Sequence, residues 1–373
     1  KPVLIVSTVL ILAGGIFFWK AGSILNKVST NGNVFGSLTR MIPGVEDKLG
    51  GEEEGRINIL LLGMRGENVP GGGTLADTIM VASLNLQENK VAFLSVPRDL
   101  YVNNPALNAK SKINAVYAYG QQQGKGIENM KEVIGDVVGS PIHYALVINF
   151  KGFTDLVNAV GGIEVTLDEP FQEALQFNEE HVCDSYTFTK STGKFENKYH
   201  TRSDGSKYLA KSYPLCTNPN PECGGDFKLP AGTQVLNGDK ALCYARARKT
   251  SSDFARAKRQ QYIIQQIKEK ALSMGTLTDF SKVNAMLDSL GDNVKTDMQG
   301  WEMKRMFDLQ QKMQNPQMTQ FVLENSAEGL LYTPQSTPET GYILSPIGDN
   351  FDKIREKFKN IFGVPAQNAS NPS

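Results

Sequence analysis

The chain has 373 residues, and its 39 lysines and arginines are balanced by 39 aspartates and glutamates. This length suits one large domain with extensions, and the balanced charge excludes the basic surplus that is typical of nucleic-acid-binding proteins. The four cysteines form no C-x-x-C pair and the three histidines are scattered, so neither a zinc ribbon nor a histidine metal site is indicated.

The chain begins with an apolar segment. Residues 3–19 (VLIVSTVLILAGGIFFW) carry no charge and are flanked by Lys1 and Lys20. As a helix they would span about 26 Å, which is close to the thickness of a hydrocarbon core. We expect residues 1–20 to be a transmembrane signal anchor rather than a cleaved signal peptide, because no A-x-A cleavage site follows Trp19. Both interpretations place the rest of the chain outside the cytoplasm. Residues 21–55, rich in glycine, serine and asparagine and then acidic, predict a flexible linker.

The next part alternates strand and helix patterns. Continuous apolar runs predict strands at 57–63, 78–84 and 91–96, and Pro97 ends the third. Helical patterns at 112–119 and 127–138 follow, and then a strand at 144–148, a helix at 153–160 and a strand at 163–167. This alternation predicts an α/β sandwich with a central mixed sheet.

Residues 178–226 interrupt this alternation. They are polar and contain three of the four cysteines, so we expect a surface insertion that a disulfide could staple. The sequence does not determine the pairing of Cys183, Cys216, Cys223 and Cys243.

Helical patterns dominate the remainder. We expect a helical turn at 237–242, helices at 254–272, 280–290 and 301–313, a strand at 319–323 and an amphipathic helix at 350–362. We therefore assign residues 56–325 to the folded body and 326–373 to a C-terminal extension with that helix and a loose tail.

Arginines gather after the insertion. If residues 243–248 are extended, Tyr244, Arg246 and Arg248 share one face of the strand, and two adjacent guanidinium groups would favour a bound anion. If the segment is helical, the two arginines lie about 200° apart and the argument fails.

The following helix repeats the pattern. Arg256, Arg259 and Gln260 share a face, and Arg256 lies in the first turn, where a bound anion would offset its unfavourable interaction with the helix dipole. The alternative is that these arginines pair with Asp253 or with other surface acids. Four arginines within 246–259 favour an anion site.

Two weaker signals lie earlier in the chain. Asp77 stands at the entry to the second strand, where it could meet a divalent cation or only cap a turn. Arg98 and Asp99 directly follow the strand-ending Pro97, a place that often carries function in α/β sheets, although a local ion pair would explain them equally well.

These segments together resemble the LytR-CpsA-Psr family of cell-envelope phosphotransferases. The resemblance rests on INILLLG (57–63), ADTIMVASLNL (76–86), VAFLSVPRDLYV (91–102), KINAVYAYG (112–120), FKGFTDLVNAVGGIEVTL (150–167) and LPAGTQVLNGDKALCYARARKTSSDFARAKRQQYII (229–264). It implies an α/β/α sandwich with a hydrophobic pocket for a polyprenyl chain. It also implies transfer of a glycopolymer from polyprenyl pyrophosphate to peptidoglycan, which releases polyprenyl phosphate and usually requires Mg²⁺.

The resemblance also assigns roles to residues. It implies that pyrophosphate is contacted by Arg98, Lys112, Arg246, Arg248, Arg256 and Gln260, to which we add Arg259 and Arg65. Of these, Arg98, Arg246 and Arg248, together with Asp99, are the expected catalytic residues. Asp77 matches a magnesium-linked aspartate, and Asp253 is a further candidate ligand.

The sequence departs from the family pattern at two positions near Asp77. Arg65 stands where the family often has an aspartate, and Leu75 stands where it often has an arginine. The lost carboxylate weakens the expectation of a magnesium site, and we hypothesise that the Arg65 guanidinium replaces the metal charge.

We therefore expect an enzyme, a glycopolymer–peptidoglycan phosphotransferase held in the cell membrane by a single span, with its catalytic domain outside the cytoplasm. Its partners would be the lipid-linked polymer, peptidoglycan and the membrane, and no nucleic acid. The alternatives are a lipid-pyrophosphate hydrolase and a non-catalytic envelope-binding scaffold.

Overall fold

The computed structural model describes residues 48–67, 73–173, 180–183, 190–217, 223, 227–247, 251–273, 290–313 and 316–363. Within these ranges no helix is both long and apolar enough to cross a membrane. The predicted anchor at 1–20, the linker up to residue 47, the predicted helix at 280–290 apart from Leu290, and the tail from residue 364 lie outside them.

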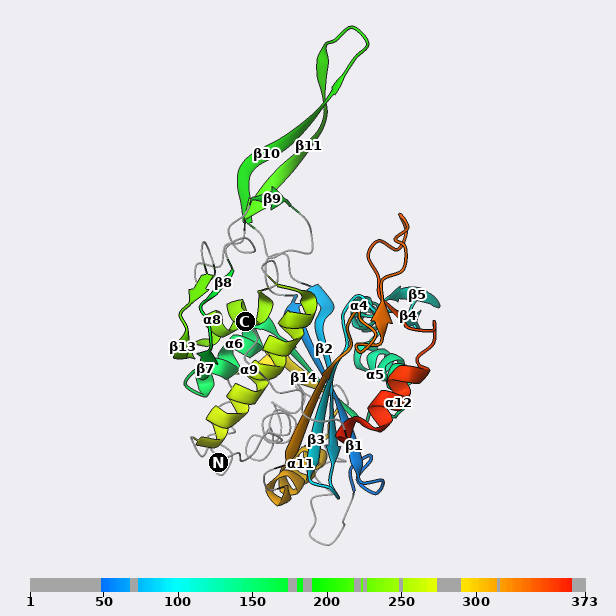
Figure 1. Cartoon of the computed structure of the whole chain (residues 1–373), viewed down its shortest axis with the longest axis vertical. Coiled ribbons are helices and arrows are strands. Elements are labelled where there is room, and N and C mark those ends of the chain that lie inside the picture. Colours follow the sequence, from blue (N-terminus) through cyan, green and yellow to red (C-terminus); the bar gives the residue numbers. More distant parts are fainter. Residues whose placement is uncertain are drawn as a thin grey trace.

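A six-stranded sheet forms the centre of the molecule, with the strand order β14-β6-β1-β2-β3-β15 (Figure 1). Strand β1 is parallel to β6 and β3 is parallel to β15, whereas the other three pairs are antiparallel. The predicted mixed sheet is therefore confirmed. The strands are β1 (Arg56–Gly66), β2 (Gly73–Asn85), β3 (Lys90–Ser95), β6 (Tyr144–Asn149), β14 (Val294–Thr296) and β15 (Gln317–Val322).

Helices cover both faces of this sheet (Figure 1). Helices α4 (Asn114–Gln122), α5 (Gly126–Val138) and α12 (Asp352–Lys359) lie on one side. On the other side lie α6 (Phe150–Ala159), α8 (Gly238–Arg246), α9 (Asp253–Ser273) and α11 (Gly300–Lys312). Alternation along β1 sends Ile57 and Ile59 into one core and Leu60 and Leu62 into the other. The apolar strand is thus buried on both faces, as expected of an α/β/α sandwich.

Shorter strand pairs lie outside the central sheet. The predicted strand at 163–167 forms, but it pairs with β13 rather than joining that sheet. The pairs are β4 (Tyr101–Asn104) with β5 (Ala109–Lys112), β7 (Ile163–Leu167) with β13 (Gly232–Leu236), β8 (Phe171–Glu173) with β12 (Phe227–Leu229), and β16 (Leu331–Tyr332) with β17 (Ser345–Pro346). Two 3₁₀ turns, η1 (Gly291–Asn293) and η2 (Ile361–Gly363), complete the assignment.

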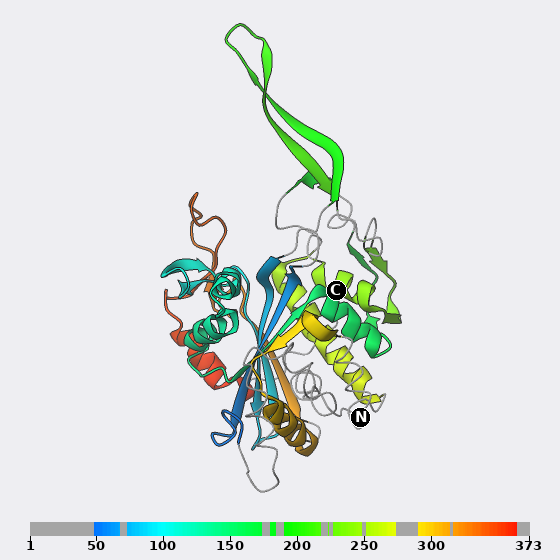
Figure 2. The same cartoon turned by 180° about the vertical axis from the view of Figure 1, so that it is seen from behind.

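The insertion is a long antiparallel hairpin that projects from the body (Figures 1 and 2). It consists of β10 (Lys190–Thr201) and β11 (Lys207–Thr217), and the short β9 (His181–Val182) pairs with β11 at its base. One disulfide, Cys183–Cys216, closes this base, and a second, Cys223–Cys243, joins the returning chain to α8. The expected disulfide is confirmed, and the structure supplies the pairing that the sequence left open.

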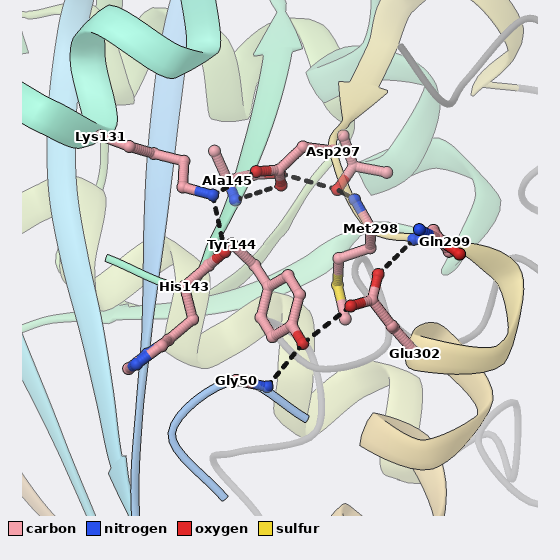
Figure 3. Close-up of polar contacts among 10 residues, drawn as sticks. Gly50, Lys131, His143, Tyr144, Ala145, Asp297, Met298, Gln299 and Glu302 are labelled. Atoms are coloured by element: carbon pink, nitrogen blue, oxygen red, sulfur yellow. Dashed lines mark hydrogen bonds and ion pairs between the residues drawn. The ribbon is translucent and has the colours of Figure 1, made fainter. Parts of the chain in front are cut away.

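A partly buried polar network joins the turn before β1, β6 and α11 (Figure 3). The hydroxyl of Tyr144 accepts a hydrogen bond from Gly50 N at 2.9 Å and donates to Glu302 Oε1 at 3.0 Å. Asp297 binds Lys131 Nζ at 2.6 Å and accepts from Ala145 N at 2.8 Å. These groups satisfy one another, so we assign them to holding the layers together.

The C-terminal segment returns to the body. Leu344 bridges to Leu100, donating its N–H to Asp99 O and accepting from Tyr101 N, both at 2.9 Å. Beyond it, Ile354 and Phe358 of α12 are buried in the second core. The guanidinium of Arg56 lies 4.3 Å from the centre of the Phe358 ring. Residues 342–361 are therefore part of the packed structure.

Candidate functional site

The first part of the site is an irregular region between β1 and β2. Gly63 pairs with Thr78, but the next pair is Met64 with Ala76, which leaves Asp77 as an extra residue in β2. A second irregularity lies between Met64 and Gly66, at Arg65. Bulges re-aim side chains and often lie beside functional sites. Here they bring Arg65 Nε within 3.7 Å of Asp77 Oδ2.

The second part is the turn after β3. Pro97 ends the strand, and Arg98 Nη1 donates to Asp77 Oδ1 at 2.8 Å. The Arg98 Nε atom lies 3.6 Å from Asp99 Oδ2, and Lys112 Nζ, at the end of β5, donates to Asp99 Oδ1 at 2.8 Å. The side chains thus form one row in which cations alternate with the carboxylates of Asp77 and Asp99. We call its three cations, Arg65, Arg98 and Lys112, the cation row.

The third part is the end of α8, where the structure selects the helical alternative for residues 243–246, so the shared strand face of Tyr244 and Arg246 does not form. Residues up to Arg246 are helical, because Asn237 Oδ1 caps the start by accepting from Lys240 N at 2.9 Å and because the helix buries Tyr244 completely. Tyr244 therefore faces the core, not the site. The helix ends at Ala247, whose backbone is extended.

Arg246 reaches the site from the last turn of this helix. Its guanidinium carbon lies 4.8 Å from the centre of the Phe150 ring at the start of α6. Burial, assisted by the charge of Arg65 and opposed by that of Asp77, lowers the pKa of Arg246 to about 10. This side chain therefore lies within electrostatic range of the cation row and remains positive at neutral pH.

The fourth part is the first turn of α9. Ser252 Oγ accepts from Ala255 N at 3.1 Å and so caps the helix. Arg256, only 9% exposed, and Gln260 line a pocket together with Asp77 and Arg98. The Gln260 side chain also donates to Ala245 O at 3.3 Å, which connects the first turns of α9 to the end of α8.

Arg259 lies elsewhere, and its predicted place at the anion site is wrong. It is completely buried and donates to Tyr244 O, to Ala247 O and, at 3.0 Å, to Ser251 Oγ. Its guanidinium group thus satisfies the carbonyl groups at the end of α8. Arg259 is a positioning residue for the segment that carries Arg246.

The pocket has charged and apolar walls. Besides Asp77, Arg98 and Arg256, the lining includes apolar residues from β2, from the ends of β3 and β15 and from α9: Ile79, Val96, Pro97, Phe254, Ala257, Val322 and Leu323. A wider hollow lies elsewhere, between Arg56, Gln87 and Phe362, but Arg56 there packs on aromatic rings and donates to Phe358 O. The first pocket is the better candidate because it joins cations to an apolar wall.

Two predicted site residues cannot be placed. Arg248 lies outside the described residues, and of Asp253 the structure describes only the backbone. Both stay predictions.

The residues around Asp77 do not fit a magnesium ion. Mg²⁺ prefers carboxylate oxygens and water, but Asp77 lies between Arg98 and Arg65, and Asp99 lies between Lys112 and Arg98. Among the described residues, no three histidine, cysteine or acidic side chains come together as a metal site would require. A divalent cation at Asp77 would face two guanidinium groups at close range.

Sequence reasoning missed several contributors. No sequence motif indicated that the Phe150 ring would pack against Arg246. None indicated the buried hydrogen bond beside the pocket either, in which Gln261 Nε2 donates to Ser95 Oγ at 2.7 Å. Phe254 was visible only as the first residue of a predicted helix. The break in β1–β2 pairing had one signal, the glycines at 63 and 66, which are common at bulges.

Comparison with known proteins gives this geometry a context. TagU of Bacillus mycoides, named as a polyisoprenyl-teichoic acid–peptidoglycan teichoic acid transferase, is 26% identical over 333 residues, covering 84% of this chain and 86% of the relative. The Bacillus anthracis protein of the same name is 28% identical over 308 residues, with 81% and 78% covered.

Solved structures share the fold. Protein gbs0355 from Streptococcus agalactiae matches with a TM-score of 0.57 at 20% identity, covering 85% of this chain and 91% of that one. TagT of B. subtilis matches with a TM-score of 0.52 at 20% identity, covering 86% and 96%. The model of the LytR_cpsA_psr family matches residues 26–341, so this chain belongs to the LytR_cpsA_psr family.

Proposed function

We propose that this protein is a phosphotransferase that moves a glycopolymer from a polyprenyl-pyrophosphate carrier onto peptidoglycan and releases polyprenyl phosphate. The observation that carries the proposal is that Arg98 and Arg256, from two separate segments, line one pocket with Asp77, while Arg246 from a third segment interacts electrostatically with Asp77. The relatives named as teichoic acid transferases supply the polymer class and the acceptor.

The pocket suits a lipid diphosphate because its two kinds of wall match the two parts of that ligand. Arg98 and Arg256 would neutralise the diphosphate, and the apolar lining residues would contact the first part of the polyprenyl chain. Phosphoryl transfer needs positioning and charge neutralisation more than covalent help, and arginines supply both.

In the proposed reaction an acceptor hydroxyl attacks the phosphorus that carries the polymer. The bond from that phosphorus to the bridging oxygen breaks, and its electrons leave with polyprenyl phosphate. Arg98 and Arg256 would stabilise the charge that develops on the leaving phosphate. The hydroxyl proton would go to Asp77, which lines the pocket, whereas the pocket lining does not include Asp99.

Asp99 then has a different task. It lies between Arg98 and Lys112 and is 8% exposed, so it would hold both cations in place without touching substrate. Asp99 is a positioning residue in this proposal.

We further propose that Arg65 supplies the positive charge that a metal ion would bring beside Asp77. Its Nε atom is 3.7 Å from Asp77 Oδ2, and its charge affects the pKa of Arg246, so it stands within reach of a diphosphate held there. Transfer by the wild-type chain should therefore persist in excess EDTA. Arg65→Asp should lose activity in EDTA and regain it with Mg²⁺. A strict Mg²⁺ requirement in the wild type would contradict this role, and binding of farnesyl diphosphate with and without EDTA gives an activity-independent readout.

Two further features support a site outside the cytoplasm at a membrane. The two disulfides are typical of oxidising compartments, and the donor itself would be embedded in the bilayer. The proposed membrane anchor is residues 1–20.

The test of the function is a reconstituted transfer assay with lipid-linked polymer and peptidoglycan. Arg98→Ala and Arg246→Ala should each reduce transfer about 10²–10³-fold, the scale for losing one group that stabilises transition-state charge. Lys353→Ala, on the exposed face of α12, is the matched control. Full activity in both arginine variants would refute the proposal. Release of polyprenyl phosphate at the same rate without acceptor would identify the protein as a lipid-pyrophosphate hydrolase. Absence of any turnover in the wild type would favour the non-catalytic envelope-binding scaffold.

A further inference from the structure

The β10–β11 hairpin is built differently from the rest of the molecule. Neither of the two cores contains any of its residues. Four of its apolar or aromatic side chains are nevertheless well exposed: Phe195 by 59%, Tyr199 by 57%, Leu209 by 50% and Tyr208 by 42%. Exposed apolar groups of this size gathered on one element typically mark a binding surface.

The hairpin is also basic, although the chain as a whole is neutral. Residues 191–216 contain five cations, Lys194, Lys198, Arg202, Lys207 and Lys211, against the carboxylates of Glu196 and Asp204. Asp204 is used in the turn, where it accepts from Ser206 N and Oγ. Within the described residues, Lys194 is the one cation of the five in an ion pair, with Glu180. The hairpin therefore presents a net positive surface.

Cations and rings lie together on this surface. Lys198 Nζ is 5.6 Å from the centre of the Tyr213 ring, and the Arg202 guanidinium is 4.8 Å from that of Tyr208. A sugar can stack on such a ring while a phosphate pairs with the neighbouring cation. A polymer in which sugars or polyols alternate with phosphates matches this repeated combination.

The hairpin leaves the body at the end that carries the site. It projects from the end of the sheet at which β1 ends and β2 begins (Figures 1 and 2). The Cys223–Cys243 disulfide ties its returning chain to α8, the helix that ends in Arg246. At 3.3 Å per residue, the twelve residues of β10 reach about 40 Å. A long polymer attached to the diphosphate could thus lie along the hairpin.

We propose that the β10–β11 hairpin is a docking arm for the polyanionic glycopolymer whose linkage end enters the pocket. This inference rests on the proposed function for the identity of the polymer. It adds a second binding surface, outside the pocket, that selects long anionic chains over short or neutral ones.

The test measures binding of purified teichoic acid to the whole chain, with dextran as the neutral polymer. Replacing residues 197–212 with Asn-Gly keeps the Glu196–Tyr213 pair, the turn chemistry and the Cys183–Cys216 disulfide. This variant and Lys207→Glu/Lys211→Glu should each bind teichoic acid at least about tenfold more weakly, because binding of a polyanion depends on the number of cation–phosphate contacts. Lys240→Glu/Lys353→Glu, with the same charge change on exposed helix positions, should bind as the wild type does.

Three results would overturn the docking arm. The first is an unchanged affinity for teichoic acid in both hairpin variants. The second is an equal loss of that affinity in the control variant, and the third is dextran binding as tight as teichoic acid binding. Loss of binding to anionic vesicles without loss of binding to the polymer would assign the hairpin to the membrane instead. Farnesyl diphosphate binding, measured on each variant, reports on the pocket separately. If wild type fails to transfer polymer but binds it through the hairpin, the proposed function fails and the docking arm stands.

Discussion

Asp77 and Asp99 are both carboxylates between cations, but they stand at different depths. Asp77 lines the pocket, whereas Asp99 is covered by the turn after β3 and by Lys112. The two should therefore respond differently to loss of charge.

We expect Asp77→Asn to reduce kcat about 10²–10⁴-fold, the usual contribution of a general base. Asp99→Asn should instead raise KM for the lipid donor, because Arg98 and Lys112 lose the group that positions them. Steady-state kinetics separates the two effects. The assignment is wrong if Asp99→Asn lowers kcat as much as Asp77→Asn and leaves KM unchanged.

Lys268 is a buried lysine on α9 with no role in the proposed site. It is completely buried, and within the described ranges its Nζ has no hydrogen-bond partner. Burial lowers its pKa from 10.5 to about 7. The unfolded chain therefore binds more protons than the folded chain between these pH values, so stability rises with pH across that window by up to about 1.4 kcal/mol per unit.

Lys268→Met should remove this slope and stabilise the protein at pH 7, because a neutral side chain of similar length fills the same space. Urea unfolding from pH 6.5 to 10 measures both effects. Equal pH dependence in variant and wild type would show that Lys268 stays protonated when folded.

Among the described elements, α8 shows where the local sequence pattern was ambiguous. The sequence of residues 243–248 is compatible with a strand, in which side chains alternate between two faces, and equally with a helix. Only the helix cap at Asn237 and the burial of Tyr244 favour the helix. Arg256 and Gln260 line the pocket as their predicted shared face implied, but Arg259 contacts the end of α8 instead. The end of α8 places the carbonyl groups of Tyr244 and Ala247 against that arginine, which no local pattern encodes.

The longer elements were predictable for the opposite reason. Strands β1 to β3 and helices α5 and α9 have one dominant period or an unbroken apolar run, so tertiary contacts had little to override. The Arg98–Asp99 turn could also be found, since Pro97 marks it. The β1–β2 bulge could not, because a register shift depends on both partners.

The Cys223–Cys243 disulfide holds α8 in place while the other disulfide holds the hairpin. It closes a loop with a sequence separation of 20 residues, and both cysteines are completely buried. Cys223→Ala/Cys243→Ala should therefore cost about 3 kcal/mol of unfolding free energy and reduce transfer, since Arg246 follows on the same helix. Cys183→Ala/Cys216→Ala should leave the unfolding of the body nearly unchanged. Chemical denaturation measures the unfolding free energy and the transfer assay measures activity. A larger loss of stability and activity in the Cys183→Ala/Cys216→Ala variant would contradict the prediction.

At the scale of the whole molecule, the site depends on a segment far along the chain. Leu344 pairs with the backbone on both sides of Leu100, and α12 buries Ile354 and Phe358. A chain ending at residue 340 keeps every candidate site residue but should lose transfer and unfold at lower urea. Phe358→Ala, which removes only packing, should cost about 3–5 kcal/mol. Wild-type activity in the shortened chain would show that the turn at Asp99 forms without Leu344.

The contact between Leu344 and Asp99 also sets an order of events during synthesis. While a ribosome still holds Leu344, the backbone partners of the Arg98–Asp99 turn have not yet emerged. A nascent polypeptide would thus carry every arginine of the proposed site yet lack a finished catalytic turn. Activity would begin only after Leu344 has emerged, when the late segment closes over the early one.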